Sequence, residues 1–234
     1  MKRNITAIVP AAGWGRRFGC SPKKPFVDLL GIPLLIHTLK RLHAVNSIRE
    51  IIPVLSKEDM EKGLELIETY KLNKVKRIAP GGKERQDSVY NALRLLIEED
   101  LILIHDGVRP LVTQELVERV LSEINRNKDI DGVVSGIPLK ETLKEVTDNG
   151  SVISTARRER FWTIQTPQVF YFNLLKKAYE KAYKDKFYAT DDAALVERIG
   201  RKVKVILGDP FNIKVTTPED IEMVKYLLKK QLEF

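Results

Sequence analysis

The sequence is poor in the residues that build disulfide frameworks and metal sites. It holds one cysteine, Cys20, in 234 residues, so no disulfide can form within the chain and a cysteine-rich zinc site is excluded. Its three histidines form no HExxH pattern, which argues against a histidine-based metal site. This cysteine usage predicts a reducing, cytoplasmic environment.

Long apolar runs are also lacking. No stretch approaches the roughly 18 apolar residues that a membrane-spanning helix needs. The N-terminal apolar run ends at Val9 and is followed by Pro10 and Gly13, which does not fit a secretory signal. We find no internal repeat, low-complexity linker or long run of one charge. The length suits one large α/β domain or two small ones.

Basic residues outnumber acidic ones. Lysine and arginine number 40 and aspartate and glutamate 32, which gives a formal net charge of +8. Hydrophobic residues make up 43% and charged residues 31%, which is typical of a globular protein and not of a disordered one. The charge indicates an anionic partner, which could be nucleic acid, a membrane surface or a phosphorylated small molecule.

Short β-branched or apolar runs alternate along the chain with longer amphipathic ones. Strands are expected at 5–9, 48–55, 75–78, 101–104, 131–138, 203–207 and 212–215, and helices at 33–42, 57–70, 84–97, 113–124, 172–183, 192–199 and 218–228. This alternation predicts a mostly parallel sheet whose strands are joined by helices. Ligands of such sheets bind at the carboxyl ends of the strands, so the loops there are candidate sites.

Residues 140–160 break this alternation. The segment is polar and contains Asp148-Asn149-Gly150, flanked by alternating residues. An Asn-Gly turn in such a setting favours a β-hairpin. We therefore expect a protruding β-arm over 140–160.

The loop after the first expected strand reads PAAGWGRRF. Its glycines and alanines would let a phosphate chain approach the backbone, and Arg16, Arg17, Lys23 and Lys24 place four cations nearby. The GxxxxGK[ST] pattern is absent, and Phe18 occupies the third glycine position of the dinucleotide fingerprint. The loop is compatible with a polyphosphate cradle and equally with an ordinary turn that carries solvated basic residues.

Two further loops follow expected strands. In PGGKERQDS, the glycine pair exposes backbone groups that could read a base edge, or the segment is an ordinary helix start. In HDGVRP, Asp106 could serve a metal or a sugar hydroxyl, and Arg109 could hold a phosphate bidentately. The alternative for this loop is an Asp–Arg pair that only closes a turn. We expect His105 to orient the loop and not to transfer protons.

Two later segments carry polar candidates. In Thr190-Asp191-Asp192 we interpret the carboxylates as helix caps and Thr190 as a ligand contact. Lys214 lies in a β-branched stretch, where a lysine is expected to face solvent or a charge.

PAAGWGRRF, PKK, GG-ERQDS, HDGVRP, QTPQ, TDDA and NIKVT, in this order, resemble the cytidylyltransferases of isoprenoid-precursor synthesis. The motifs run from Pro10 to Pro218, so the resemblance covers nearly the whole chain. It implies a single Rossmann-like nucleotidyltransferase domain over 1–234, working as a homodimer in which the 140–160 arm embraces the partner. It also implies transfer of a cytidylyl group from CTP to 2-C-methyl-D-erythritol 4-phosphate, with Mg²⁺ and with release of pyrophosphate.

The resemblance also implies a role for each matching residue. CTP would be bound by Ala11, Ala12, Gly13, Gly15, Gly82, Ser88 and Asp106. The catalytic cations would be Arg17, Lys23 and Lys214. Methylerythritol phosphate would be bound by Asp106, Arg109, Thr142, Arg158, Thr190 and Lys214, with Thr142 and Arg158 reaching in from the partner chain. Mg²⁺ would be held mainly by the CTP phosphates, with no protein ligand assigned.

The sequence departs from the family pattern at several positions. Lys24 stands where glutamine is usual, Lys83 stands where an acidic or small residue is usual, and HDGVRP replaces HDAARP. Arg157 stands where an acidic residue is common, so Arg157 could take the role assigned to Arg158.

Two alternatives to this function are considered. Ribitol phosphate cytidylyltransferases share HD-xx-RP, QTPQ and NIKVT, but PAAG and TDD favour methylerythritol phosphate as the substrate. A basic nucleic-acid-binding module is the other alternative, although no helix-turn-helix or aromatic-interleaved RNA motif is found. We expect no membrane partner.

Overall fold

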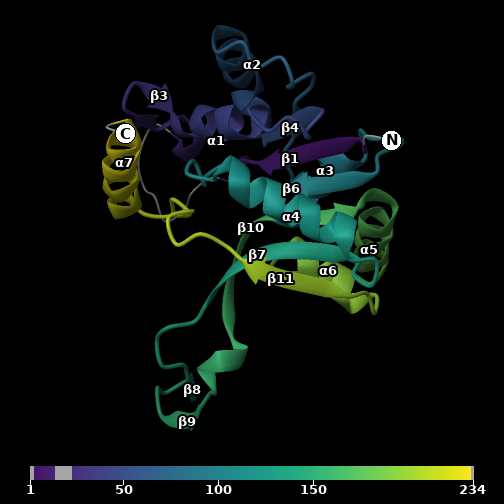
Figure 1. Ribbon diagram of the computed structural model, residues 1–234, viewed down its shortest axis with the longest axis vertical. Coiled ribbons are helices and arrows are strands. Elements are labelled where there is room, and N and C mark those ends of the chain that lie inside the picture. Colours follow the sequence, from purple (N-terminus) through teal and green to yellow (C-terminus); the bar gives the residue numbers. More distant parts are fainter. Residues whose placement is uncertain (1–2, 14–22, 233–234) are drawn as a thin grey trace.

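A central sheet of seven strands forms the middle layer of the protein (Figure 1). The computed structural model describes residues 3–13 and 23–232. The strands lie in the order β11-β7-β10-β6-β1-β4-β5. Their bounds are Ile5–Pro10 (β1), Glu50–Leu55 (β4), Ala79–Pro80 (β5), Leu101–Ile104 (β6), Gly132–Pro138 (β7), Trp162–Tyr171 (β10) and Val203–Leu207 (β11).

The sheet is mostly parallel, which confirms the fold class predicted from the sequence. β1 pairs in parallel with β4 and β6, and β5 and β11 also run parallel to their neighbours. β10 runs antiparallel to both β6 and β7, and its register shifts between Ile164 and Gln168. This strand was not expected from the sequence, although it contains the QTPQ motif.

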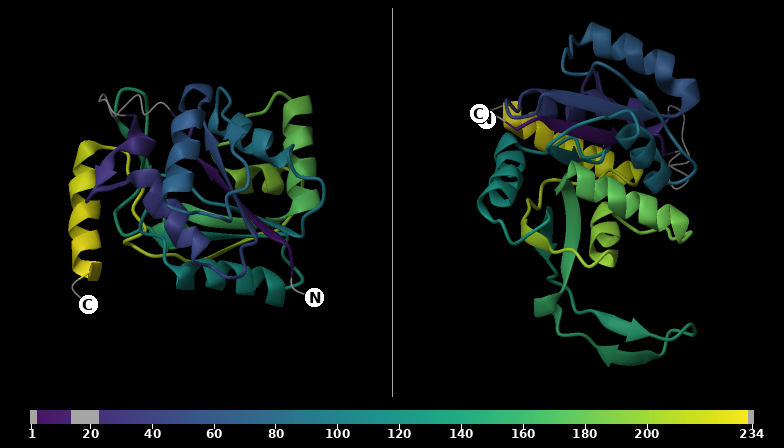
Figure 2. Two further views of the ribbon diagram at one scale, coloured as in Figure 1. Left: turned by 90° about the horizontal axis from the view of Figure 1, so that it is seen from above. Right: turned by 90° about the vertical axis from the view of Figure 1, so that its right-hand side faces the viewer.

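Helices cover both faces of the sheet (Figures 1 and 2). Their bounds are Leu34–His43 (α1), Met60–Thr69 (α2), Arg85–Leu93 (α3), Gln114–Arg126 (α4), Phe172–Lys184 (α5), Asp192–Arg198 (α6) and Pro218–Leu232 (α7). α1, α2 and α4 bury apolar residues on one face, and α3, α5 and α6 do so on the other. α7 packs in a third cluster with β2 (Asp28–Leu29), which pairs with the short strand β3 (Ile32–Pro33).

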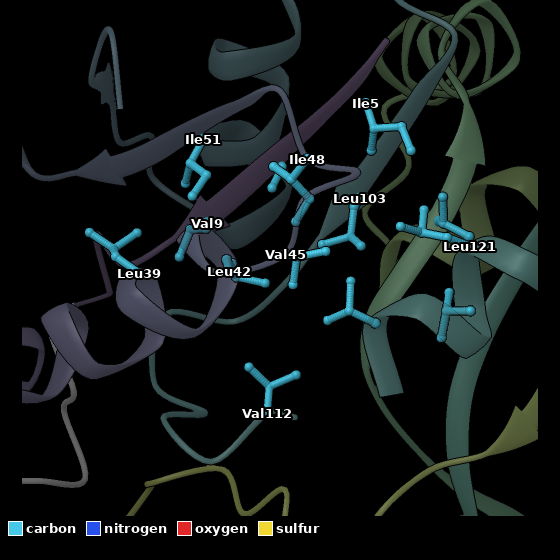
Figure 3. Close-up of a cluster of buried hydrophobic side chains, with 14 of the residues drawn as sticks. Ile5, Val9, Leu39, Leu42, Val45, Ile48, Ile51, Leu103, Val112 and Leu121 are labelled. Atoms are coloured by element: carbon cyan, nitrogen blue, oxygen red, sulfur yellow. The ribbon is translucent and has the colours of Figure 1, made fainter. Parts of the chain in front are cut away.

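Side chains alternate between the two faces along each buried strand. In β1, Ala7 and Val9 belong to the cluster under α1, α2 and α4, whereas Ile8 belongs to the opposite one. Figure 3 shows the first cluster, in which Val9 and Leu103 of the sheet belong with Leu39 and Leu42 of α1. Burial on both faces explains why β6 is continuously apolar and β1 nearly so in the sequence.

Two expected strands are absent from the structure. Within 75–78 only Val75 forms an isolated bridge, to Ile51, and the strand β5 follows at Ala79–Pro80. Residues 212–215 form no strand because this segment crosses the ends of the strands and bonds to a loop: the N–H of Val215 donates to the carbonyl of Val108 (2.9 Å).

Residues 140–160 lie away from the sheet, at the foot of Figure 1. Within them, β8 (Lys144–Val146) and β9 (Val152–Thr155) pair antiparallel. Gly150 in the connecting turn has a φ of 83°, which a glycine adopts without strain. β7 leads out to this hairpin and β10 leads back from it.

The described part of the chain, 3–13 and 23–232, contains no helix that is long and apolar enough to cross a membrane.

Candidate active site

A cavity of about 590 Å³ opens where the loops after β1, β5 and β6 meet. Six of the seven residues expected to bind CTP line it, namely Ala11, Ala12, Gly13, Gly82, Ser88 and Asp106. The seventh, Gly15, lies outside the described residues, as does Arg17. The candidate loops, which follow strands in the sequence, therefore lie together in the fold, at the carboxyl ends of the strands.

Small residues allow these loops to touch. A Cβ on Gly81 would lie 2.3 Å from the Cβ of Ala12, so a larger residue there would push the two loops apart. A Cβ on Gly82 would lie 2.2 Å from the Cβ of Asp87. The N–H of Gly82 donates to Ser88 Oγ (3.1 Å), which ties the loop to the start of α3. The glycine pair is thus required by packing.

Asp106 is the centre of the site. Its buried carboxylate accepts a hydrogen bond from Arg85 Nε (3.2 Å) and lies 2.9 Å from Lys214 Nζ. Arg109 Nε lies 3.6 Å from the same carboxylate. Burial alone would raise the pKa of Asp106, but these three cations outweigh it and hold the pKa well below its ordinary value. Asp106 is therefore ionised at neutral pH.

A second cavity of about 470 Å³ adjoins the first. Asp106, Arg109, Thr190 and Lys214, four of the residues expected to bind methylerythritol phosphate, line it. Asp106 and Lys214 line both cavities, so these side chains form the wall between them. The other two expected residues, Thr142 and Arg158, lie in the 140–160 segment and line neither cavity.

Arg85 also lines both cavities, and reasoning from the sequence assigned it no role. It is the first residue of α3, directly after the loop with the glycine pair. A helix that starts at the carboxyl edge of the sheet keeps its first side chains at that edge, which is the signal that could have identified Arg85.

The two lysines of the PKK motif occupy different places. Lys23 Nζ binds Asp59 Oδ2 (2.9 Å) and Ser56 Oγ (3.3 Å), and this residue does not line either cavity. Lys24 lines the first cavity and donates to the carbonyl of Val215 (3.2 Å). The departure from the family pattern at Lys24 therefore adds a cation to the cavity wall.

His105 is fully buried beside Asp106. Its Nε2–H donates to the carbonyl of Arg109 (3.1 Å), and its Nδ1 accepts from the hydroxyl of Thr166 (3.1 Å). The same hydroxyl oxygen accepts the N–H of Asp106 (3.0 Å). Burial lowers the pKa of His105 to about 4, so the imidazole is neutral at pH 7. This geometry agrees with the expectation that His105 orients the loop.

The two carboxylates of TDDA have different roles. Asp191 caps α6, because its side chain accepts the N–H of Ala194 (3.0 Å). Asp192 does not cap the helix. It is 1% exposed and accepts Arg85 Nη1 (2.7 Å). The expectation that both carboxylates cap the helix is therefore wrong for Asp192.

The buried histidine predicts a loss of stability in mild acid. The pKa of His105 is about 4 in the folded protein and 6.5 in the unfolded chain, so the unfolded chain binds the extra proton between these values. Stability is therefore lost as the pH falls through this window, by about 2 kcal/mol between pH 7 and pH 5. Urea unfolding at the two pH values measures it. In His105→Gln the difference between pH 7 and pH 5 should shrink by that amount, and an unchanged difference would contradict the assignment.

Sequence and structure comparisons give one family. A sequence profile described as 2-C-methyl-D-erythritol 4-phosphate cytidylyltransferase matches residues 5–230. Curated relatives with that description include one from Syntrophus aciditrophicus, 43% identical over 99% of this chain and 98% of that protein. Another, from Dictyoglomus thermophilum, is 42% identical over 97% of both chains.

Solved structures agree with the sequence matches. The 4-diphosphocytidyl-2C-methyl-D-erythritol synthase from Anaerococcus prevotii superposes with a TM-score of 0.85 at 34% identity, covering 97% of each chain. The 2-C-methyl-D-erythritol 4-phosphate cytidylyltransferase from Thermus thermophilus gives 0.77 at 30% identity, covering 95% of this chain and 98% of that one. The profile spans nearly the whole chain, and the matching motifs surround the two cavities, so this chain is an enzyme of the 2-C-methyl-D-erythritol 4-phosphate cytidylyltransferase family.

Proposed function

We propose that CTP binds in the first cavity and 2-C-methyl-D-erythritol 4-phosphate in the second. The observation that carries this assignment is the shared wall of Asp106, Arg85 and Lys214, which brings two anionic ligands together at one cationic edge. A phosphate oxygen of the acceptor then attacks the α-phosphorus of CTP, and the bond to the β-phosphate oxygen breaks. The products are 4-diphosphocytidyl-2-C-methyl-D-erythritol and pyrophosphate.

The reaction needs charge neutralisation more than proton transfer. The second pKa of a phosphate monoester is near 6, so at pH 7 the nucleophile is mostly a dianion and requires no general base. A neutral, fully buried His105 agrees with this requirement. Lys214 lines both cavities with 43% of its side chain exposed, which supports the proposal that it neutralises both phosphates as they approach.

Arg17 and Lys23 are proposed as the cations on the triphosphate. Lys23 lies next in sequence to Lys24, which is on the cavity wall, and its ammonium is held by Asp59. We propose that the triphosphate replaces Asp59 as the partner of Lys23 when CTP binds. Until CTP binds, the Asp59 carboxylate would hold the Lys23 ammonium beside the first cavity.

Mg²⁺ is proposed to enter with CTP. Within 3–13 and 23–232 no group of three or more acidic, histidine or cysteine side chains could hold a metal ion. The carboxylates of the first cavity are Asp106, which is bound to cations, and Glu84. These residues fit a metal held mainly by phosphate oxygens, where it supplies charge neutralisation at the triphosphate.

We also propose a homodimer in which the 140–160 arm carries Thr142 and Arg158 to the partner's second cavity. The arm exposes Val146 (52%), Val152 (60%) and Ile153 (58%), an apolar set that a partner could cover. In the same chain, Arg158 Nη1 donates to the carbonyl of Lys140 and approaches neither cavity wall. Arg157 is also exposed on this segment and remains an alternative to Arg158.

Mixed dimers test whether the arm serves the partner's site. Arg158→Ala and Lys214→Ala should each be nearly inactive alone. When the two variants are co-expressed, one site of each mixed dimer is intact, so about a quarter of the wild-type turnover per site should return. If Arg158 acts within its own chain, both sites of a mixed dimer are defective, because one lacks Arg158 and the other lacks Lys214. Turnover then stays at the level of the single variants.

The activity itself is tested by pyrophosphate release from CTP, Mg²⁺ and methylerythritol phosphate, with ribitol phosphate as the competing acceptor. We expect release with methylerythritol phosphate and little with ribitol phosphate. The reverse order would support the ribitol phosphate alternative, and release with neither acceptor would contradict the proposed function.

A cytoplasmic location is proposed on the single cysteine.

A further inference from the structure

A chain of polar side chains runs from the protein interior to the wall between the cavities. The hydroxyl of Tyr179 donates to Asp192 Oδ1. Arg85 Nη1 donates to Asp192 Oδ2 (2.7 Å), and Arg85 Nε donates to Asp106 Oδ1 (3.2 Å). One guanidinium therefore joins two carboxylates from α6 and from the loop after β6.

Tyr179 and Asp192, at the interior end of this series of side chains, are closed to solvent. Tyr179 is 0% exposed and Asp192 is 1% exposed. A carboxylate so deeply buried needs a partner for each oxygen, and here the hydroxyl and the guanidinium supply one each. Burial first, and then the charge of Asp192, raise the pKa of Tyr179 well above its usual value, so the hydroxyl keeps its proton and remains a donor.

Arg85, at the outer end of this series of side chains, lies in the candidate site. The Arg85 side chain is 29% exposed and lines both cavities. Its planar guanidinium has donors in a fixed arrangement, so anchoring Nη1 on Asp192 also sets the direction of Nε. Nε holds one oxygen of Asp106, and Lys214 Nζ lies 2.9 Å from the other. The position of Lys214 therefore depends on a carboxylate whose orientation Arg85 fixes.

Asp192 is also needed to balance the positive charges around Asp106. Arg85, Arg109 and Lys214 are three cations around Asp106. With Asp192 the group carries two negative charges against three positive ones, which leaves a net charge of +1 at the place where two phosphates meet. Without Asp192, Arg85 would have Asp106 as its one carboxylate partner among these residues and could rotate about that contact.

We propose that Asp192, itself held by Tyr179, is a positioning residue that fixes Arg85 and through it sets Asp106 and Lys214 for the substrate phosphate. Neither Asp192 nor Tyr179 touches substrate in this proposal, which rests on the proposed function of the two cavities. A displacement of a reacting group by about 1 Å can lower a rate by about 100-fold, so a residue behind the site can matter to the reaction.

Asp192→Asn and Tyr179→Phe test the proposal by steady-state kinetics of pyrophosphate release. For Asp192→Asn we expect kcat to fall by about 30-fold and KM for methylerythritol phosphate to rise several-fold. KM for CTP should rise less than KM for methylerythritol phosphate, because the first cavity is also lined by Ala12, Gly13 and Gly82, which are not among the side chains that link Tyr179 to Lys214. Tyr179→Phe removes one oxygen atom and should produce a weaker form of the same pattern, about 5-fold in kcat.

Tyr183→Phe is the matched control. It removes a hydroxyl from the same helix, α5, which donates to Asp87 (2.6 Å) and not to Asp192. This variant should keep kcat within about twofold of wild type, so a general loosening of α5 would be recognised by a loss in both tyrosine variants. Since Tyr179 acts through Asp192, adding Tyr179→Phe to Asp192→Asn should cost little further activity.

The results separate the proposal from its alternatives. If the wild-type enzyme releases no pyrophosphate, the proposed function fails. If the wild type is active and Asp192→Asn, shown to be folded by its thermal unfolding, keeps wild-type kcat and KM, the positioning role is overturned. Should Asp192→Asn fail to fold, Tyr179→Phe decides by the same constants: a fall in kcat, with KM rising less for CTP than for methylerythritol phosphate, supports the role, and wild-type kinetics overturns it.

Discussion

Lys214→Ala should lower kcat for cytidylyl transfer by about 10³-fold, with the fold retained. Lys214 Nζ lies 2.9 Å from Asp106 on the wall shared by the two cavities, where the phosphates of the two substrates are proposed to approach each other. Removal of one preorganised group that stabilises developing charge costs about 10²–10³ in kcat, and this lysine is proposed to serve both substrates. Stopped-time pyrophosphate release at saturating CTP and methylerythritol phosphate measures the effect.

Lys204→Ala is the control for this substitution. Lys204 also carries a charge and also binds a carboxylate, Glu123 (2.7 Å), but it lies on β11 and lines neither cavity. Its removal changes the net charge by the same amount and should leave kcat within about twofold of wild type. Equal losses in the two variants would show that overall charge matters, and not the position of Lys214.

Asp106→Asn should lower both stability and activity. The substitution leaves Arg85, Arg109 and Lys214 around a neutral amide, so three cations face one another without the carboxylate that now separates them. Removal of one partner from a fully buried ion pair costs about 3–5 kcal/mol. Since 43% of the Lys214 side chain and 29% of the Arg85 side chain are exposed, water recovers part of this, and we expect a loss of about 2–3 kcal/mol.

Urea unfolding at pH 7 measures the stability change, and turnover under the same conditions should fall by at least about 100-fold because the lysine and the arginines lose their common anchor. Glu222→Gln provides the comparison, since it breaks an exposed pair with Lys225 and should not change the unfolding midpoint. A midpoint for Asp106→Asn equal to that of wild type would mean that the three cations do not depend on this carboxylate.

The alternation of buried strands and amphipathic helices was readable from the sequence because each element carries its own periodicity. β6 is continuously apolar and β1 is apolar apart from Thr6, and both were predicted within a residue of their bounds. β10 was missed because QTPQ contains a proline and polar residues, and only its pairing with β6 and β7 on either side makes it a strand. The expected strand at 212–215 has β-branched residues, but its hydrogen bonds go to the loop that contains Val108.

Some residues of the candidate site were likewise identifiable from the sequence, and others were not. Residues such as Gly82, Asp106 and Lys214 were identifiable because they follow strands or belong to motifs whose members are close in sequence. Arg85 was missed because its carboxylate partners, Asp106 and Asp192, are 21 and 107 residues away in the sequence, and Asp192 had been interpreted as a cap. The spacing of Thr190-Asp191-Asp192 suits a helix start, and Asp191 does cap α6. Nothing local distinguishes the second carboxylate from the first.

The sequence by itself determined the α/β class, the strand-end loops and the family, because those depend on local periodicity and on motifs in a fixed order. The net charge of +8 does not by itself show where the cations gather in the folded protein. Only the tertiary structure decided that three cations converge on Asp106, that Lys23 binds Asp59 while Lys24 lines the cavity, and that a buried tyrosine bonds to the aspartate that holds Arg85. The physical reason is that ion pairs and burial depend on which helices the folded sheet brings side by side, and neighbouring residues in the sequence do not encode that.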